Sequence, residues 1–273
     1  PGGTGLATFR DNEEVNDRYF DVGIAEEHAA LFASGLATQG LKPFLTIYST
    51  FMQRAFDMLV HDIGIQNLPV RLCMDRAGLS GDDGPTHHGL FDIGYLRHVP
   101  NFVFMQPKDE EEFVDMLWTM ANHDSGPIAV RYPRGSGTGA KPKNKPQELE
   151  IGKAEVVQSG NDIGLIGLGH LFSMAEQTCT SLEEQGHSVE LINPRFIKPM
   201  DASAIKAMAS KVKVICTFED HVLHNGFGAA VIELLHESEI NTPVVRIGWP
   251  DEFVEHGNIP ALRKKHGLSH EDA

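Results

Sequence analysis

Residues 21–28 read DVGIAEEH, a short apolar run followed at once by two carboxylates and an imidazole. The pattern predicts a buried strand over residues 19–24 that turns directly into a helix over residues 25–39, where apolar side chains recur at helical spacing. In an open α/β sheet, ligands lie outside the carboxyl ends of the strands, so a site is expected at this turn. A carboxylate also stabilises a helix N-terminus, so the turn alone does not separate a capping role from a catalytic one.

Strands and helices alternate along the whole chain. The expected strands are 43–48, 69–74, 101–105, 128–132, 162–167, 188–192, 214–218 and 244–247, and the longer helices are 51–65, 107–122, 171–185, 202–211, 226–236 and 259–266. Strands joined through helices form parallel sheets with right-handed crossovers. The sequence therefore predicts an α/β protein with two domains, each a mostly parallel sheet flanked by helices. We expect the domains at 1–140 and 151–273, with a linker over 141–150 in a region rich in Gly, Lys and Pro.

Composition narrows the class of protein. The chain has 273 residues, 41% of them hydrophobic and 22% charged, which is ordinary for a globular protein. A formal net charge of −15 argues against a nucleic-acid or anionic-membrane partner. Cys73, Cys179 and Cys216 are scattered, which favours structural thiols in a reducing compartment. We expect a bacterial cytoplasmic protein, with a plastid as the alternative, and the opening Pro1–Gly5 leads us to expect a chain derived from a longer one.

Chemically capable side chains follow several of the predicted strands. Glu26 follows the first, Tyr48, Phe51 and Arg54 the second, Arg76, Asp83 and His87 the third, and Arg131 and Arg134 the last strand of the first domain. Because the ends of parallel strands lie at one edge of a sheet, these residues are expected to converge. Arginines there suit a phosphate or carboxylate, although Arg131 has an equal claim to a structural ion pair with a neighbouring acid.

The loop of residues 75–89 reads DRAGLSGDDGPTHHG, with four glycines that allow close approach of its backbone to a ligand. The adjacent His87 and His88 raise the question of a metal. No second His or Cys group lies at ligand spacing, so we expect no metal site and assign His87 as a hydrogen-bond or proton donor. In the second domain, residues 221–226 are interpreted as a capped helix start.

Four segments carry a family resemblance: FDVGIAEEHAALFASGLA at 20–37, IYSTFMQRAFDMLVHD at 47–62, DRAGLSGDDGPTHHGLFD at 75–92 and VRYPRG at 130–135. They resemble the 1-deoxy-D-xylulose 5-phosphate synthases, which are thiamine-diphosphate enzymes of the transketolase superfamily. The resemblance implies a transketolase-like pyrimidine-binding domain followed by a transketolase C-terminal-like domain. The family's first domain binds Mg²⁺ and the diphosphate through a Gly-Asp-Gly…Asn motif, which nothing in this sequence matches.

The resemblance also implies roles for seven residues. Glu26 matches the glutamate that bonds N1′ of the aminopyrimidine, and Phe51 the aromatic ring that stacks on it. Tyr48, Arg76 and Arg134 match residues that hold glyceraldehyde 3-phosphate, the arginines at its phosphate, while Asp83 and His87 match polar residues close to the reacting carbons. His87 thus counts among both the catalytic and the substrate-binding residues. Glu27 and His88 stand where Gln is expected in relatives.

The implied reaction is decarboxylation of pyruvate and transfer of the two-carbon unit to glyceraldehyde 3-phosphate, in the synthesis of isoprenoid, thiamine and pyridoxal precursors. The expected partners are an N-terminal diphosphate-binding domain or chain, which would also hold Mg²⁺, and a second copy in a homodimer. Without the N-terminal portion we expect no activity. The alternatives are another transketolase-like half, either a transketolase C-terminal part or a 2-oxo-acid dehydrogenase β subunit, and a non-catalytic scaffold.

Overall fold

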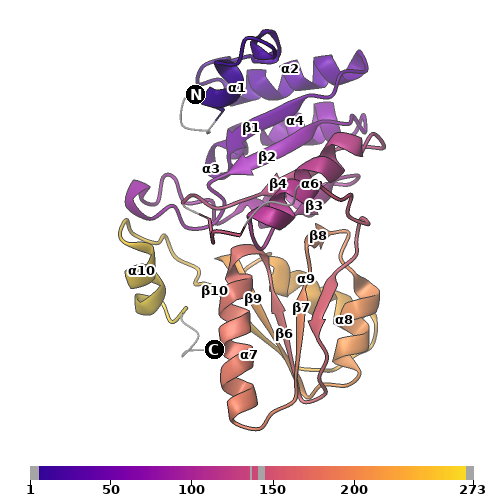
Figure 1. Cartoon of the computed structure of the whole chain (residues 1–273), viewed down its shortest axis with the longest axis vertical. Coiled ribbons are helices and arrows are strands. Elements are labelled where there is room, and N and C mark those ends of the chain that lie inside the picture. Colours follow the sequence, from indigo (N-terminus) through magenta and orange to yellow (C-terminus); the bar gives the residue numbers. More distant parts are fainter. Residues whose placement is uncertain (1–5, 136, 141–144, 269–273) are drawn as a thin grey trace.

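A computed structural model describes residues 6–135, 137–140 and 145–268. Two sheets lie one above the other along the long axis of the molecule, with helices on their faces (Figure 1). The expected linker 141–150 falls partly outside the described residues. Its described part runs along helix α6 (Glu110–Asn122), where the Gln147 amide donates to Asp115 Oδ1 at 2.7 Å and the Leu149 amide donates to Thr119 Oγ1 at 2.8 Å.

The first sheet has the spatial order β1-β2-β4-β3-β8. Its strands are β1 (Phe44–Tyr48), β2 (Arg71–Asp75), β3 (Val103–Met105), β4 (Ile128–Arg131) and β8 (Phe196–Lys198). The first four are parallel, and β8 pairs antiparallel with β3. Every residue of β2, β3 and β4 is buried, as expected for central strands covered by helices on both faces.

The second sheet has the order β10-β9-β6-β7-β5. Its strands are β5 (Glu155–Gln158), β6 (Ile163–Gly167), β7 (Val189–Asn193), β9 (Val214–Val222) and β10 (Val244–Trp249). All pairs are parallel except the edge pair of β5 with β7. The described chain therefore confirms the predicted fold class of two mostly parallel sheets flanked by helices.

The helices occupy the predicted connections. The α-helices are α1 (Ala7–Arg10), α2 (Glu26–Thr38), α3 (Ser49–Met52), α4 (Phe56–Met58), α5 (Asp92–Leu96), α6 (Glu110–Asn122), α7 (Phe172–Glu184), α8 (Ala202–Ala209), α9 (Phe227–Glu237) and α10 (Ile259–Lys265). Short 3-10 segments are η2 (Asn16–Arg18), η3 (Gln53–Ala55), η5 (Gly81–Asp83) and η6 (Gly169–Leu171), and η4 (Leu59–Gly64) is a π-helix. None of these helices combines the length and hydropathy needed to cross a membrane.

Two predicted elements differ from the structure. Residues 19–24 form no strand: Asp21 Oδ1 accepts a hydrogen bond from the Gly23 amide at 2.9 Å, and this local turn leaves Ile24 87% exposed. The single helix predicted over 51–65 is divided among α3, η3, α4 and the π-helix η4. Met52, Ala55, Leu59 and Ile63 are buried in the core, whereas Ile65 is 70% exposed, so the packing of these four side chains constrains the path of the backbone more than a regular helical repeat does.

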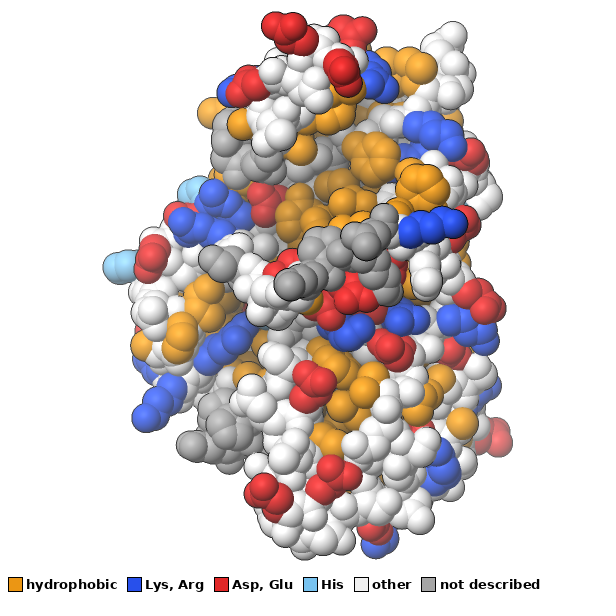
Figure 2. All heavy atoms as spheres, in the orientation of Figure 1, with side chains coloured by type: hydrophobic (Ala, Val, Ile, Leu, Met, Phe, Trp, Pro, Cys, Tyr) orange, Lys and Arg blue, Asp and Glu red, His pale blue; other side chains and the backbone are white. Residues whose placement is uncertain are grey.

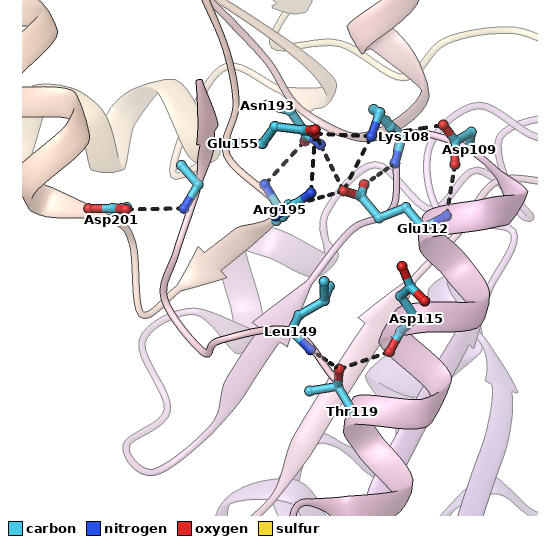
Figure 3. Close-up of polar contacts among 11 residues, drawn as sticks. Lys108, Asp109, Glu112, Asp115, Thr119, Leu149, Glu155, Asn193, Arg195 and Asp201 are labelled. Atoms are coloured by element: carbon cyan, nitrogen blue, oxygen red, sulfur yellow. Dashed lines mark hydrogen bonds and ion pairs between the residues drawn. The ribbon is translucent and has the colours of Figure 1, made fainter. Parts of the chain in front are cut away.

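The two domains share a polar interface. Figure 2 shows acidic and basic side chains side by side at mid-height, and Figure 3 shows how several of them meet. Glu112 of α6 accepts from Arg195 Nε at 2.7 Å and from Asn193 Nδ2 at 2.8 Å, both in the second half of the chain. Lys108 Nζ lies 3.1 Å from Glu155 Oε2. Strand β8 extends this contact, because it follows β7 in the chain but pairs with β3.

His221 joins the domains at a second point. It is fully buried in β9, and its Nε2 accepts a hydrogen bond from the Gly94 amide of α5 at 3.1 Å. His221 is therefore not part of a helix start, and the interpretation of residues 221–226 from the sequence is wrong at this residue. Helix α9 is capped instead by Glu219, which accepts from the Phe227 amide at 2.6 Å and the Gly228 amide at 2.9 Å. Burial lowers the pKa of His221 to about 4, since the charged ring would lose its hydration.

This shift predicts acid sensitivity of the interface. The folded-state pKa of His221 lies below the unfolded value of about 6.5, so its contribution is complete above pH 6.5 and is lost as pH falls towards 4. We expect His221→Gln, whose amide does not titrate, to remove on the order of 3 kcal/mol of the stability lost between pH 7 and pH 4. Urea unfolding at both pH values measures this. His224→Gln is the control because His224 is 72% exposed, and equal pH dependence in the two variants would contradict the prediction.

Candidate functional site

Seven predicted site residues lie at the carboxyl edge of the first sheet. Tyr48 ends β1, Phe51 lies in α3, Glu26 begins α2, and Arg76 follows β2. Asp83 ends η5, His87 lies further along the same loop, and Arg134 follows β4. The structure brings all seven into one continuous chain of contacts, as the convergence of strand ends predicts. Their chemical roles remain predictions.

The first part of this cluster is a carboxylate next to aromatic rings. Glu26 is 9% exposed, and its Oε1 accepts from Arg54 Nη1 at 3.0 Å. The Arg54 guanidinium also lies 4.8 Å from the centre of the Phe51 ring. Phe51 stacks on Tyr48 with ring centres 5.7 Å apart and meets His87 edge-on at 5.2 Å. Arg54 thus connects the two predicted cofactor-binding residues, a role that its position after β1 did not reveal.

The second part is a carboxylate shared by two arginines. Asp83 forms an ion pair with Arg76 and another with Arg134, whose Nη1 lies 2.8 Å from Asp83 Oδ2. The Arg76 guanidinium lies 4.1 Å from the centre of the Tyr48 ring, which links this group to the aromatic one. Arg134 also donates to the carbonyl of Ser80 at 3.2 Å. Two guanidinium groups and one carboxylate leave a net positive charge, which suits a phosphate.

Arg76 has an unusual backbone. Its φ is +57°, in the left-handed region that non-glycine residues seldom adopt. Its amide donates to Asp75 Oδ1 at 2.7 Å, which stabilises this turn. Burial raises the pKa of the Asp75 carboxyl, and the hydrogen bond from Arg76 and the nearby arginine charges oppose that shift. The strained residue directs its side chain towards Asp83 as β2 ends.

The adjacent histidines point to different partners. His87 packs on Phe51 and its Nδ1 lies 2.9 Å from Thr86 Oγ1. His88 is buried, accepts from the Ser80 amide at 3.1 Å, and lies 3.2 Å from the carbonyl oxygen of Glu255 in the second domain. Burial lowers the pKa of His88, which favours the neutral ring. Among the described residues no group of three His, Cys, Asp or Glu side chains is arranged to hold a metal ion.

Arg131 resolves the alternative that the sequence left open. It is fully buried, and its Nε donates to Asp92 Oδ2 at 2.9 Å. Its other nitrogens donate to Gln106 Oε1 at 2.5 Å and to the carbonyls of Gly89 and Asp220 at 3.3 and 3.1 Å. Arg131 is a structural residue between the domains. Glu27 is exposed at the start of α2, where it suits the helix dipole.

The family models for "Transketolase, pyrimidine binding domain" and "Transketolase, C-terminal domain" match residues 1–138 and 152–272. The chain belongs to the transketolase family. A curated 1-deoxy-D-xylulose-5-phosphate synthase of Acidobacterium capsulatum is 57% identical over 273 residues, and one of Methylacidiphilum infernorum is 54% identical over 273 residues. In both cases the match covers 100% of this chain and 43% of the relative, so the chain spans less than half of these proteins.

A solved structure described as "Split gene transketolase, inactive beta4 tetramer" has the same fold. Its TM-score is 0.85 at 28% sequence identity, over 98% of this chain and 85% of that chain. These comparisons confirm the resemblance to the transketolase superfamily and to the 1-deoxy-D-xylulose 5-phosphate synthases.

The shared carboxylate predicts how the site responds to an anion. In Asp83→Asn, Arg76 and Arg134 lose a counter-charge, so a phosphate no longer competes with a carboxylate for them. We expect about tenfold tighter binding of inorganic phosphate, measured by titration calorimetry. Asp82→Asn is the control, because it makes the same change in charge at an exposed neighbouring residue. Equal phosphate affinity in the two variants would show that Asp83 does not neutralise the pair.

Proposed function

We propose that this chain supplies the pyrimidine-binding and C-terminal domains of a 1-deoxy-D-xylulose 5-phosphate synthase. The enzyme would condense pyruvate, with loss of carbon dioxide, and glyceraldehyde 3-phosphate. The observation that carries the proposal is the single chain of contacts from the Glu26–Arg54 ion pair through Phe51 and Tyr48 to the arginines around Asp83. These contacts support the proposal because they connect a buried carboxylate with two arginines, on a chain 57% identical to a curated synthase.

The residues present fit the pyrimidine half of thiamine diphosphate. Glu26 is buried at a helix start, and Arg54, which pairs with it, also lies against the half-buried ring of Phe51. Glu26 would share a proton with N1′ of the aminopyrimidine, in a setting where low polarity strengthens one hydrogen bond. Thiamine diphosphate, when bound, supplies the carbon nucleophile and the electron sink for decarboxylation. No motif of this chain fits the diphosphate or Mg²⁺, which we assign to an N-terminal domain or chain.

Substrate recognition would rest on the other half of the cluster. Arg76 and Arg134 would bind the phosphate of glyceraldehyde 3-phosphate in place of part of their pairing with Asp83. Tyr48 supports Arg76 through a cation–π contact, because the guanidinium lies over its ring. His87 packs edge-on against Phe51, from where it would donate a proton or hydrogen bond to a substrate oxygen.

Exposed apolar residues near Glu26 support the need for a partner. Ile24 is 87% exposed, Phe20 56% and Phe44 45%, and all three lie around the start of α2 or the free edge of β1. An N-terminal domain or a second copy of the chain would bury them. The similar split-gene transketolase is described as an inactive β4 tetramer, which supports the proposal that a chain of this kind associates with copies of itself and is inactive in that state. The relatives are bacterial, which favours a bacterial cytoplasmic enzyme.

The role of Glu26 is tested by proton exchange in the enzyme assembled with its N-terminal portion. Glu26→Gln keeps the size of the side chain but removes the carboxylate that would share the N1′ proton. We expect exchange of the C2 proton of bound thiamine diphosphate, followed by NMR, to slow by about 100-fold or more. Glu27→Gln is the matched control on the exposed neighbouring residue. A normal exchange rate in Glu26→Gln would return this residue to helix capping.

The phosphate site is tested by steady-state kinetics. We expect Arg76→Ala and Arg134→Ala each to raise the KM for glyceraldehyde 3-phosphate by about tenfold or more, since each removes a charge-assisted contact. The KM for pyruvate should stay unchanged. Arg18→Ala, at a residue whose side chain is 67% exposed, controls for the loss of a positive charge. An unchanged KM for glyceraldehyde 3-phosphate in both site variants would refute the assignment.

A further inference from the structure

The loop of residues 75–89 carries Arg76, Asp83 and His87, and the second domain contacts it at other residues: Leu79, Gly81 and His88. Asp220 is the centre of that contact. It lies in β9 with 1% exposure, and its Oδ2 accepts a hydrogen bond from the Leu79 amide at 3.2 Å. The Asp220 carboxylate therefore reaches from the second sheet to the backbone of a loop in the first domain.

Asp220 is itself held by residues of the second domain. Trp249 Nε1 donates to its Oδ1 at 2.6 Å, and His170 Nε2 lies 2.8 Å from its Oδ2. Arg263 Nη2 lies 3.8 Å from the same oxygen. Burial alone would raise the pKa of Asp220, but the hydrogen bond and charge of His170 hold it well below its ordinary value. The carboxylate is thus a fixed, ionised acceptor.

The loop is shaped to receive this carboxylate. Gly78 has a φ of +81°, and a Cβ added there would lie 2.2 Å from Asp220 Oδ2, so only glycine fits. Gly78 and Gly89 exchange two backbone hydrogen bonds of 2.8 Å, which close the loop at its base. The contact with Asp220, at Gly78 and the Leu79 amide, therefore falls at the closed base of the loop, two and three residues after Arg76.

Two further contacts hold the loop from the same side. His88 bonds to the Glu255 carbonyl, and the Gly257 amide donates to the Gly81 carbonyl at 3.2 Å. Apolar residues from both domains fill the space between them: Leu79, Leu90, Val222, Trp249, Val254, Leu262 and Leu268. The residues after β10 thus pack against the loop that carries the charged groups.

We propose that Asp220, held by His170 and Trp249, is a positioning residue that sets the place of Arg76 and Asp83 for phosphate binding. The C-terminal domain would then contribute to substrate recognition without touching the substrate. This inference rests on the proposed phosphate site. Asp220 acts through the Leu79 amide: a shift of the loop base moves Arg76 directly, and moves the Ser80 carbonyl that accepts from Arg134. Small displacements of such groups have large effects on binding and reaction.

The test uses Asp220→Asn. The Leu79 amide and the Trp249 ring nitrogen both donate to Asp220, and the amide nitrogen of Asn, itself a donor, would face one of them. Hydrogen exchange of the chain should show amides of residues 76–89 exchanging about tenfold faster, the effect of losing one buried hydrogen bond. Affinity for inorganic phosphate should fall by about tenfold. In the assembled enzyme the KM for glyceraldehyde 3-phosphate should rise about tenfold, with kcat and the KM for pyruvate changed by less than about twofold.

Glu112→Gln is the matched control. Glu112 is another buried carboxylate at the domain interface, with 4% exposure, but the residues of the second domain that it binds are Arg195 and Asn193 (Figure 3), so it makes no bridge from that domain to the loop. It should reduce overall stability and leave loop exchange, phosphate affinity and the KM for glyceraldehyde 3-phosphate unchanged. If Glu112→Gln reproduces the effects of Asp220→Asn, or if Asp220→Asn changes loop exchange but not phosphate affinity, Asp220 is only structural and the proposal fails.

His170→Gln decides the matter if Asp220→Asn does not fold. His170 is partly exposed, and its substitution removes one of the partners of Asp220. The same pattern of changes should therefore appear with a smaller amplitude. Unchanged loop exchange and phosphate affinity in His170→Gln would overturn the proposal. Exchange and phosphate binding need no turnover, so they keep this inference separate from the proposed function. Should the assembled enzyme not use these substrates, the proposed reaction fails while the loop measurements still judge Asp220.

Discussion

The buried guanidinium of Arg131 is the interaction on which the rest of the structure depends. A charge removed from water must be paired and hydrogen-bonded, and leaving it without its partner costs about 3–5 kcal/mol. Arg131 meets this requirement with the carboxylate of Asp92, the amide of Gln106 and the carbonyls of Gly89 and Asp220. Asp92 lies in α5, Gln106 directly after β3, Gly89 at the end of the loop of residues 75–89, and Asp220 in β9. One side chain therefore ties both sheets and the loop to the end of β4.

The geometry of the site follows from this arrangement. Ser49 Oγ donates to Asp92 Oδ2 at 2.9 Å, so the acid that pairs with Arg131 also binds the first residue of α3, the helix that carries Phe51. Gly89 and Asp220, which accept from Arg131 through their carbonyls, are also the residues that close and hold the base of the loop. The partners of one buried charge, Arg131, thus hold both the aromatic and the cationic parts of the site. A rigid reference of this kind is what a preorganised site requires.

How much of this could be predicted from the sequence depends on the range of the interaction. Helix α2 was predicted to within a residue or two because its apolar repeat is local. Strands β5 and β8 were missed because both are short, antiparallel and defined by partners far along the chain. His221 and Arg131 look like ordinary polar residues at strand ends, and their partners lie far from them in the chain: the Gly94 amide for His221, and Asp92, Gln106, Gly89 and Asp220 for Arg131. The convergence of the site residues, Arg54 included, was predictable because a parallel sheet puts strand ends at one edge. The pairing of Arg54 with Glu26 and the contact of Asp220 with the loop could be seen only in the folded structure.

The charges of the site also show how an anionic substrate would be recognised. The chain as a whole carries −15, so its overall field repels a phosphate. In the ion pairs of the cluster, Arg54, Arg76 and Arg134 contribute three positive charges against two from Glu26 and Asp83, and the Asp75 carboxylate beside Arg76 lowers this excess of one. Because charges beyond about 8–10 Å are largely screened at physiological ionic strength, this small excess acts only at close range. Recognition must then come from contact geometry and not from long-range attraction, which is why the placement of the loop base matters so much to the arginines it carries.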